Sequence, residues 1–175
     1  ILGFITWVAF FILGMLFIKP FFSMYTDSAN ILNLATEYTN IVVYFSFGII
    51  IHIVIEKILQ GSGSMIYPMV FVLVGAIINI ILDPIFIFGY FGVPNLGVKG
   101  AAIATVIGQI TAMVLAVVTL VVRKGEVKIK KRNLRFDLNI IKEIYVVGIP
   151  ATIMFVLGSV LVVGLNSILI KISAV

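Results

Sequence analysis

A carboxamide and a carboxylate lie one helical turn apart inside an apolar stretch of the sequence, GAIINIILDPIFIFG, residues 75–89. Asn79 and Asp83 are four residues apart, so a helix would place them on the same face. Thr105 adds a hydroxyl on the next apolar stretch, and Tyr38 adds a phenol on an earlier one. Several oxygen atoms satisfy a desolvated sodium ion, and a single carboxylate can exchange a proton. These four side chains are therefore candidates for a cation site.

Asp83 makes insertion of its helix into the membrane less favourable. An acid at the centre of a membrane helix raises the free energy of insertion by about 2.5 to 3.5 kcal/mol. Intramembrane acids are for this reason functional candidates. Pro84 has no N–H to donate to the Ile80 carbonyl, which leaves an oxygen free near Asp83. The alternative is that Asp83 only ties two helices together, by hydrogen bonding to Thr105 or to a backbone group.

The composition indicates a membrane protein. Hydrophobic residues make up 62% of the chain and charged residues 11%, with a mean hydropathy of +1.29, far outside the range of soluble domains. A helix needs roughly 20 mostly apolar residues to cross the hydrocarbon core. Strands of a membrane barrel would alternate apolar and polar residues, whereas these runs are apolar on every side. The sequence therefore predicts an all-α integral membrane protein.

Five membrane helices are predicted, separated by proline, glycine and charged clusters. Their expected ranges are 1–18, 31–60, 65–90, 100–122 and 139–170. The first should stop at Lys19-Pro20, and the second at the glycine and serine cluster of residues 60–64. Pro84 and Pro150 are expected to kink the third and fifth helices.

The basic residues predict the orientation. Seven of the 12 lysines and arginines lie in residues 123–135, and short basic loops stay in the cytoplasm. The loop of residues 91–99 should then face outward. The favoured interpretation of the basic segment is a solvated linker held near anionic lipid, because membrane helices on both sides make nucleic-acid binding improbable. The chain has no cysteine, which excludes disulfides and thiolate metal sites.

The candidate cation ligands reach similar depths. Asp83 lies seven residues inside the end of its helix, roughly 10 Å deep, and Thr105 lies eight residues inside the next helix, roughly 12 Å deep. Tyr38 and Glu37 lie near the outer end of the predicted helix of residues 31–60, at a comparable depth. We therefore expect Asn79, Asp83, Thr105 and Tyr38 to converge in the outer half of the bundle.

The other polar residues give no catalytic constellation. His52 is the one histidine, and we expect it in the core, bonded to a neighbouring backbone group or water rather than to a metal. Glu56 and Lys57 should snorkel or pair with each other. Walker and dinucleotide glycine motifs are absent from the sequence. The prediction is a protein that is not an enzyme and uses no cofactor.

The stretch GAIINIILDPIFIFG, followed by GVKGAAIATVIGQ, resembles the fifth and sixth helices of the multidrug and toxic compound extrusion (MATE) family of secondary transporters. ATEYTNIVVYFSFG and EKILQGSGSMIYPM resemble the fourth helix of that family and the turn after it. EIYVVGIPATIMFVLGSVLVVGLNSILI resembles the seventh helix. The resemblance implies a fragment holding about helices three to seven of a twelve-helix, two-lobe transporter of the MOP superfamily.

This resemblance also implies how the chain is divided. Residues 1–122 would form the C-terminal part of the N-lobe, with helices three to six. Residues 123–138 would be the cytoplasmic basic linker between the lobes, and residues 139–175 the first helix of the C-lobe. The implied location is the plasma membrane, with the full-length protein a multi-pass monomer.

The activity implied by the resemblance is efflux of lipophilic or cationic small molecules and drugs, by antiport against sodium or protons with alternating access. Asn79, Asp83 and Thr105 match an asparagine, an aspartate and a threonine of the N-lobe cation site in some members, and Tyr38 is a weaker match. Sodium is then the one metal expected, at Asp83, Asn79 and Thr105. Two alternatives remain open: a lipid-linked oligosaccharide or polysaccharide flippase of the same superfamily, and a non-transporting membrane scaffold.

The predicted orientation can be tested with single cysteines, since the chain has none. In the full-length protein in intact cells, an impermeant thiol reagent should label Pro94→Cys and leave Lys128→Cys unlabelled, because the basic loop is held inside. Labelling after permeabilisation is the control for accessibility. Labelling of Lys128→Cys in intact cells, with Pro94→Cys protected, would refute the orientation.

Overall fold

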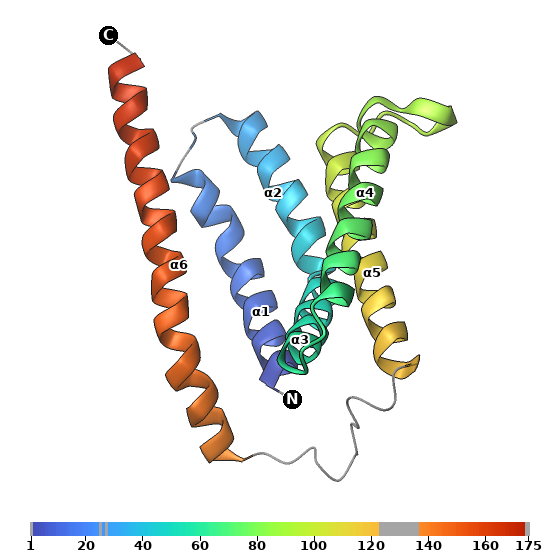
Figure 1. Ribbon diagram of the computed structural model, residues 1–175. Helices are drawn as coiled ribbons and strands as arrows, with labels where there is room; N and C mark the ends of the chain where they lie inside the picture. Colours follow the sequence, from blue (N-terminus) through green and yellow to red (C-terminus); the bar gives the residue numbers. More distant parts are fainter. Residues whose placement is uncertain (1, 25, 27, 123–136, 174–175) are drawn as a thin grey trace. The chain divides into compact units, whose positions relative to one another are not determined.

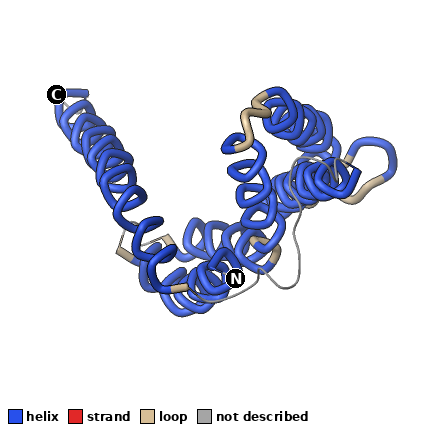
Figure 2. Tube along the Cα trace, turned by 60° about the horizontal axis from the view of Figure 1, so that its bottom comes forward, coloured by secondary structure: helices blue, strands red, loops and turns tan. Residues whose placement is uncertain are grey.

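The computed structural model describes residues 2–24, 26, 28–122 and 137–173, and every regular element among them is helical (Figure 2). The elements, labelled in Figure 1, are α1 (Leu2–Ser23), α2 (Ala29–Tyr44), α3 (Phe47–Gly61), α4 (Ile66–Phe88), the short 3₁₀ helix η1 (Tyr90–Gly92), α5 (Val98–Val122) and α6 (Leu138–Ser173). The predicted all-α class is confirmed. The basic segment of residues 123–135 lies outside the described residues.

Among the described helices, α1, α4, α5 and the stretch Leu138–Asn166 of α6 are each long and apolar enough to cross a membrane. A fifth span is present if α2 and α3, which are bent by 52° at the break between them, are taken together. The number of spans thus agrees with the sequence prediction.

The chain separates into two units, Ile1–Lys130 and Lys131–Val175. In the second unit the described element is α6, which begins directly after Asp137. The Asp137 carboxylate accepts the backbone N–H of Asn139 at 2.9 Å, a cap that satisfies one of the free donors at the start of the helix. The first unit contains the other helices and the candidate site. The division at residues 122 and 138 that the sequence suggested stays a prediction.

The prediction of one helix over residues 31–60 is wrong, because this range contains both α2 and α3. The break falls at Phe45 and Ser46. The Ser46 hydroxyl donates to the Val43 carbonyl at 2.7 Å and accepts the indole N–H of Trp7 at 3.1 Å. A serine bonded to a carbonyl of the preceding turn competes with the regular helix bonds and favours a bend. Trp7 belongs to α1, so the bend is held from a neighbouring helix.

The predicted end of the first helix at residue 18 is also wrong, because α1 continues through Pro20 to Ser23. Proline removes one hydrogen bond, and that cost is small when only the last turn follows it. The Ser23 hydroxyl donates to the Pro20 carbonyl at 2.8 Å and satisfies one of the free acceptors of this turn. Helices α4 and α6 also run through Pro84 and Pro150. The kinks predicted at those prolines stay predictions.

Helices α4 and α5 pack backbone against backbone. A Cβ atom on Gly108 would lie 2.7 Å from the Gly75 carbonyl oxygen, and one on Gly75 would lie 3.0 Å from the Gly108 carbonyl oxygen. Nearer the connecting loop, a Cβ atom on Gly100 would overlap the carbonyl of Phe86. Without hydrophobic driving force between helices in lipid, such close contacts stabilise helix pairs. The glycines therefore set how near the polar side chains of α4 and α5 can come.

The core of the first unit lies where α3, α4 and α5 meet. Ile55 and Leu59 of α3 are buried with Phe71 of α4 and with Ala112 and Ala116 of α5. Helix α3 thus covers one end of the α4–α5 pair. Helix α2 packs against α5 and brings Tyr38 toward Thr105.

The close packing of α4 and α5 predicts that Gly108→Ala destabilises the protein. The new methyl group would press on the Gly75 carbonyl, which the helix backbone cannot move away, and overpacking of this kind costs about 1–3 kcal/mol. The full-length protein in detergent should unfold several degrees below the wild type in a thermal melt.

Gly61→Ala is the matched control, because a Cβ atom there meets nothing within 4 Å. It should melt close to the wild-type temperature. Equal melting temperatures for Gly108→Ala and the wild type would show that the two backbones are not in close contact.

Candidate functional site

The four predicted cation ligands converge in the structure. Asn79 Nδ2 donates to Asp83 Oδ1 at 3.3 Å and to Thr105 Oγ1 at 3.4 Å. Tyr38 Oη lies 3.5 Å from Thr105 Oγ1. We call Asn79, Asp83, Thr105 and Tyr38 the Asp83 cluster. Three helices contribute to it, α2 with Tyr38, α4 with Asn79 and Asp83, and α5 with Thr105.

Thr105 presents lone pairs to the cluster. Its hydroxyl donates to the Ala101 carbonyl at 2.9 Å, along its own helix. The same oxygen therefore faces Asn79 and Tyr38 as an acceptor. This arrangement depends on the close α4–α5 contact, because Thr105 lies one turn from Gly108 and Asn79 lies one turn from Gly75.

The ligand chemistry of the cluster is that of hard oxygen donors. Asp83 supplies its one carboxylate, Asn79 a carboxamide, and Thr105 and Tyr38 supply hydroxyl oxygens, all four side chains being partly buried. Among the described residues, no group of three or more histidine, aspartate or glutamate side chains could hold a metal ion. A single carboxylate with neutral oxygens suits a proton or a monovalent cation better than a transition metal.

An ion pair lies close to the cluster. Lys99 Nζ of α5 is 2.7 Å from Glu37 Oε1 of α2, and Glu37 precedes Tyr38 in the chain. Both side chains are substantially exposed, so solvent screening limits the pair to about 0–1 kcal/mol. The pair links α5 to α2 next to the contact of Tyr38 with Thr105. Sequence reasoning placed Glu37 near this level but did not identify Lys99 as its partner.

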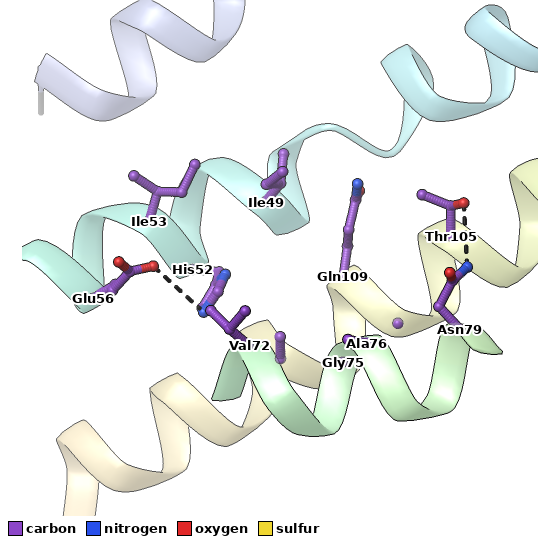
Figure 3. A pocket seen from close by; sticks show the side chains of 12 residues that line it. Ile49, His52, Ile53, Glu56, Val72, Gly75, Ala76, Asn79, Thr105 and Gln109 are labelled. Carbon is purple, nitrogen blue, oxygen red and sulfur yellow. Dashed lines mark hydrogen bonds and ion pairs between the residues drawn. The ribbon is translucent and has the colours of Figure 1, made fainter. Parts of the chain in front are cut away.

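A cavity of about 360 Å³ extends from the Asp83 cluster between α3, α4 and α5. Asn79 and Thr105 line one part of it, and His52 and Glu56 of α3 line the other (Figure 3). Gln109 lies between them along the cavity, on the same helix as Thr105 (Figure 3). The rest of the lining is apolar or small, so the cavity carries polar groups at only a few positions.

His52 is buried, as predicted. Its side-chain ring packs edge-on against Phe71, with ring centroids 6.2 Å apart. Nε2 is buried and has no hydrogen bond to any backbone group among the described residues, and the nearest charged atom is Glu56 Oε2 at 4.0 Å. The predicted bond of His52 to a backbone group or to water therefore stays a prediction.

Glu56 pairs with Lys57, as the sequence suggested, and also accepts a hydrogen bond from Gln60. Its Oε1 accepts from Lys57 Nζ at 3.4 Å and from Gln60 Nε2 at 2.8 Å. Lys57 is mostly exposed, whereas the Glu56 side chain is largely buried.

Sequence reasoning did not single out Gln109 as a cavity residue. A lone amide within the apolar range 100–122 was a signal that could have identified it.

Comparisons with known proteins found a family model and several relatives that are similar to this chain. The MatE family model matches residues 1–85. The protein named Probable multidrug resistance protein YoeA, of Bacillus subtilis, is 29% identical over 159 residues, which cover 89% of this chain and 34% of that protein. Probable multidrug resistance protein NorM, of Thermotoga maritima, is 33% identical over 120 residues, 68% of this chain and 25% of that protein.

A solved structure is similar as well. It is titled as the inward-facing conformation of a multidrug resistance MATE family transporter of the MOP superfamily. It aligns with a TM-score of 0.78 and 30% identity, over 85% of this chain and 33% of the other. The chain spans about a quarter to a third of the length of these relatives.

Proposed function

The chain belongs to the multidrug and toxic compound extrusion family, and on that premise we propose that the full-length protein exports organic cations or other drugs in exchange for sodium or protons. The observation that carries the proposal is the contact of Asn79 with both Asp83 and Thr105, at 3.3 and 3.4 Å. This contact gathers an ionisable group and neutral oxygens from two helices of an apolar bundle. The names of the two relatives support drugs as the substrate class.

In this proposal Asp83 supplies the negative charge for the coupling ion. The Asn79 N–H groups now occupy the space between Asp83 and Thr105, so an entering cation takes their place and the carboxamide turns to offer its oxygen. Thr105 already donates to Ala101 and keeps its lone pairs for the ion. The cation thereby links α4 to α5, with Tyr38 completing the contact to α2.

Coupling then follows from a population shift. The ion stabilises the cavity orientation in which α2, α4 and α5 are held together by the Asp83 cluster, and its release favours the other orientation. We propose that residues 1–122 move as part of the N-lobe, that residues 123–138 form the cytoplasmic linker, and that residues 139–175 begin the C-lobe. In this proposal the full-length protein acts as a monomer in the plasma membrane, and transport needs neither covalent chemistry nor a cofactor.

Expression of the full-length protein in an efflux-deficient bacterium should lower the accumulation of a lipophilic cation such as ethidium. Collapsing the ion gradients should abolish the effect, because the gradients drive the exchange. An effect that survives without gradients would count against secondary transport. Unchanged accumulation across a broad cation panel, together with translocation of a lipid-linked sugar, would favour a flippase.

Asp83→Asn should reduce ion-driven efflux in proteoliposomes at least about a hundredfold, because the amide keeps the shape and hydrogen bonding but not the charge. Thr105→Ala removes one neutral ligand and should weaken the dependence on the coupling ion about tenfold. The measurement compares initial efflux rates at several ion concentrations and equal protein content. Near-normal coupled efflux by Asp83→Asn would leave the buried aspartate as a helix-packing residue.

Thr111→Ala is the matched control for Thr105→Ala. Thr105 and Thr111 of α5 each donate to the carbonyl four residues earlier, Thr111 to Ile107 at 2.8 Å, but of these two only Thr105 contacts Asn79 and Tyr38. Thr111→Ala should therefore transport like the wild type. Equal losses in both variants would mean that Thr105 acts through its helix rather than as a ligand.

A further inference from the structure

The loop between α4 and α5, residues 89–97, projects beyond these two helices on the side away from α1 and α2 (Figures 1 and 2). Three aromatic residues lie where it begins, Phe88 at the end of α4 and Tyr90 and Phe91 in η1. The ring centroids of Phe88 and Tyr90 are 6.0 Å apart. All three side chains are exposed. We call these three residues the aromatic turn.

The loop is held in a defined conformation. The Leu96 N–H donates to the Phe86 carbonyl at 3.1 Å, and the Gly97 N–H donates to the Ile87 carbonyl at 3.3 Å, so the returning segment bonds to the last turn of α4. Gly89 starts the turn with a φ of 78°, and a Cβ atom there would lie 2.8 Å from a backbone oxygen across the loop. A folded backbone therefore presents the aromatic side chains.

Phe91 has a backbone conformation that disfavours its side chain. Its φ of 58° and ψ of 29° lie in the left-handed region, and among the described residues other than glycine only Phe91 has a positive φ. Contact with Cβ makes this region unfavourable for bulky residues, whereas glycine and asparagine adopt it more readily. Packing within the first unit does not compensate for the strain, because Phe91 is 91% exposed. A strained, exposed aromatic residue indicates a partner outside this unit.

The composition of the loop suits lipid as that partner. Residues 88–97 contain no charged side chain, and the next one, Lys99, is paired with Glu37 of α2. Aromatic residues are enriched where membrane-spanning helices meet water, because their rings enter the headgroup region. The aromatic turn lies at such a position, since it directly follows the apolar helix Ile66–Phe88.

The exposed apolar side of α4 leads into the aromatic turn. Asn79 and Asp83 mark the interior side of this helix, because polar residues of membrane helices face the bundle. Ile77 and Ile81 each lie two residues from Asn79, about 200° around the helix, and Phe88 lies nine residues from it, about 180° around. All three apolar side chains are exposed. The surface that ends in the aromatic turn is thus the one opposite the polar groups, where a membrane helix meets lipid.

We propose that the aromatic turn inserts into the headgroup region of the adjacent leaflet and anchors α4 and α5 at a fixed depth in the bilayer. The rings of Phe88 and Phe91 contact the upper acyl chains, and the Tyr90 hydroxyl stays among the headgroups. In the predicted orientation this is the outer leaflet. Asp83 precedes Phe88 by five residues, roughly 7.5 Å along the helix, so the anchor also sets the depth of the Asp83 cluster. The proposal does not depend on what the protein transports.

The test measures the surroundings of residue 91 in the full-length protein, in nanodiscs of phosphatidylcholine and phosphatidylglycerol. Phe91→Cys, as the only cysteine, carries an environment-sensitive fluorophore. A lipid with a nitroxide near the headgroup end of its acyl chain should reduce the emission at least about twofold, because the label lies in the interface. Iodide in the water should quench it weakly, although nanodiscs leave both membrane faces accessible to this ion.

Gly61→Cys is the matched control, because Gly61 is the last residue of α3 and a Cβ atom there meets nothing within 4 Å. The same label there should be quenched by iodide and little by the nitroxide lipid. If Phe91→Cys fails to fold, Tyr90→Cys carries the label one position earlier. Iodide quenching at residue 91 as strong as at residue 61 would place the turn in water, and quenching by neither agent would mean that protein covers it. Either result would overturn the anchor.

The contribution of the Phe91 ring is tested with the label on Tyr90→Cys. Phe91→Asn removes the ring but suits a positive φ, so the turn should keep its conformation. Quenching by the nitroxide lipid should fall at least about twofold in this variant, because the turn loses its main apolar contact. Phe91→Trp should retain the quenching, since tryptophan also favours the interface. Equal lipid quenching in the asparagine and tryptophan variants would contradict anchoring by Phe91.

Discussion

The contact between the backbones of α4 and α5 is the constraint on which the rest of the first unit depends. Helices in lipid gain little from burying apolar surface against each other, so they associate where small residues allow close approach and where polar groups bond across the gap. Gly75 and Gly108 provide the first condition, and Asn79 and Thr105 provide the second one turn away. With a larger residue at either glycine the amide of Asn79 would be too far from the Thr105 hydroxyl.

The polar groups along the cavity differ in how they are satisfied. In the Asp83 cluster the donors and acceptors already meet one another, through Asn79 and Thr105. In the proposed function, a cation entering there replaces internal hydrogen bonds, and these bonds form again when the ion leaves. His52 Nε2 and Gln109 Oε1, by contrast, have no hydrogen-bond partner within the part of the chain that the structure describes.

The bend between α2 and α3 connects the two parts. Helix α2 carries Tyr38 to the Asp83 cluster, and α3 carries His52 and Glu56 to the other part of the cavity. The two segments differ in direction by 52°, so the bend lets α3 line the cavity while α2 contacts Thr105 through Tyr38. Trp7 of α1 bonds to Ser46 at the bend, so a third helix helps to set the angle between them.

The sequence by itself determined the elements and one half of the site. Uncharged runs of membrane length predicted the helices, and the spacing of Asn79 and Asp83 placed them on one face, because the helical repeat is local. Counting residues from the loops predicted that Thr105 and Asp83 lie at the same depth in the membrane. In the structure Asn79 contacts both of them.

Only the tertiary structure decided which helix faces meet. Helices that are apolar all round carry no periodic signal for the buried side, so the approach of α4 to α5 and the sharing of one cavity by His52 and Gln109 were not readable from the sequence. The break at Ser46 depends on Trp7, 39 residues away, and the Glu37–Lys99 pair joins helices whose order in the chain does not make them neighbours. Local spacing fixes a helix face, whereas contact between faces depends on packing of the whole bundle.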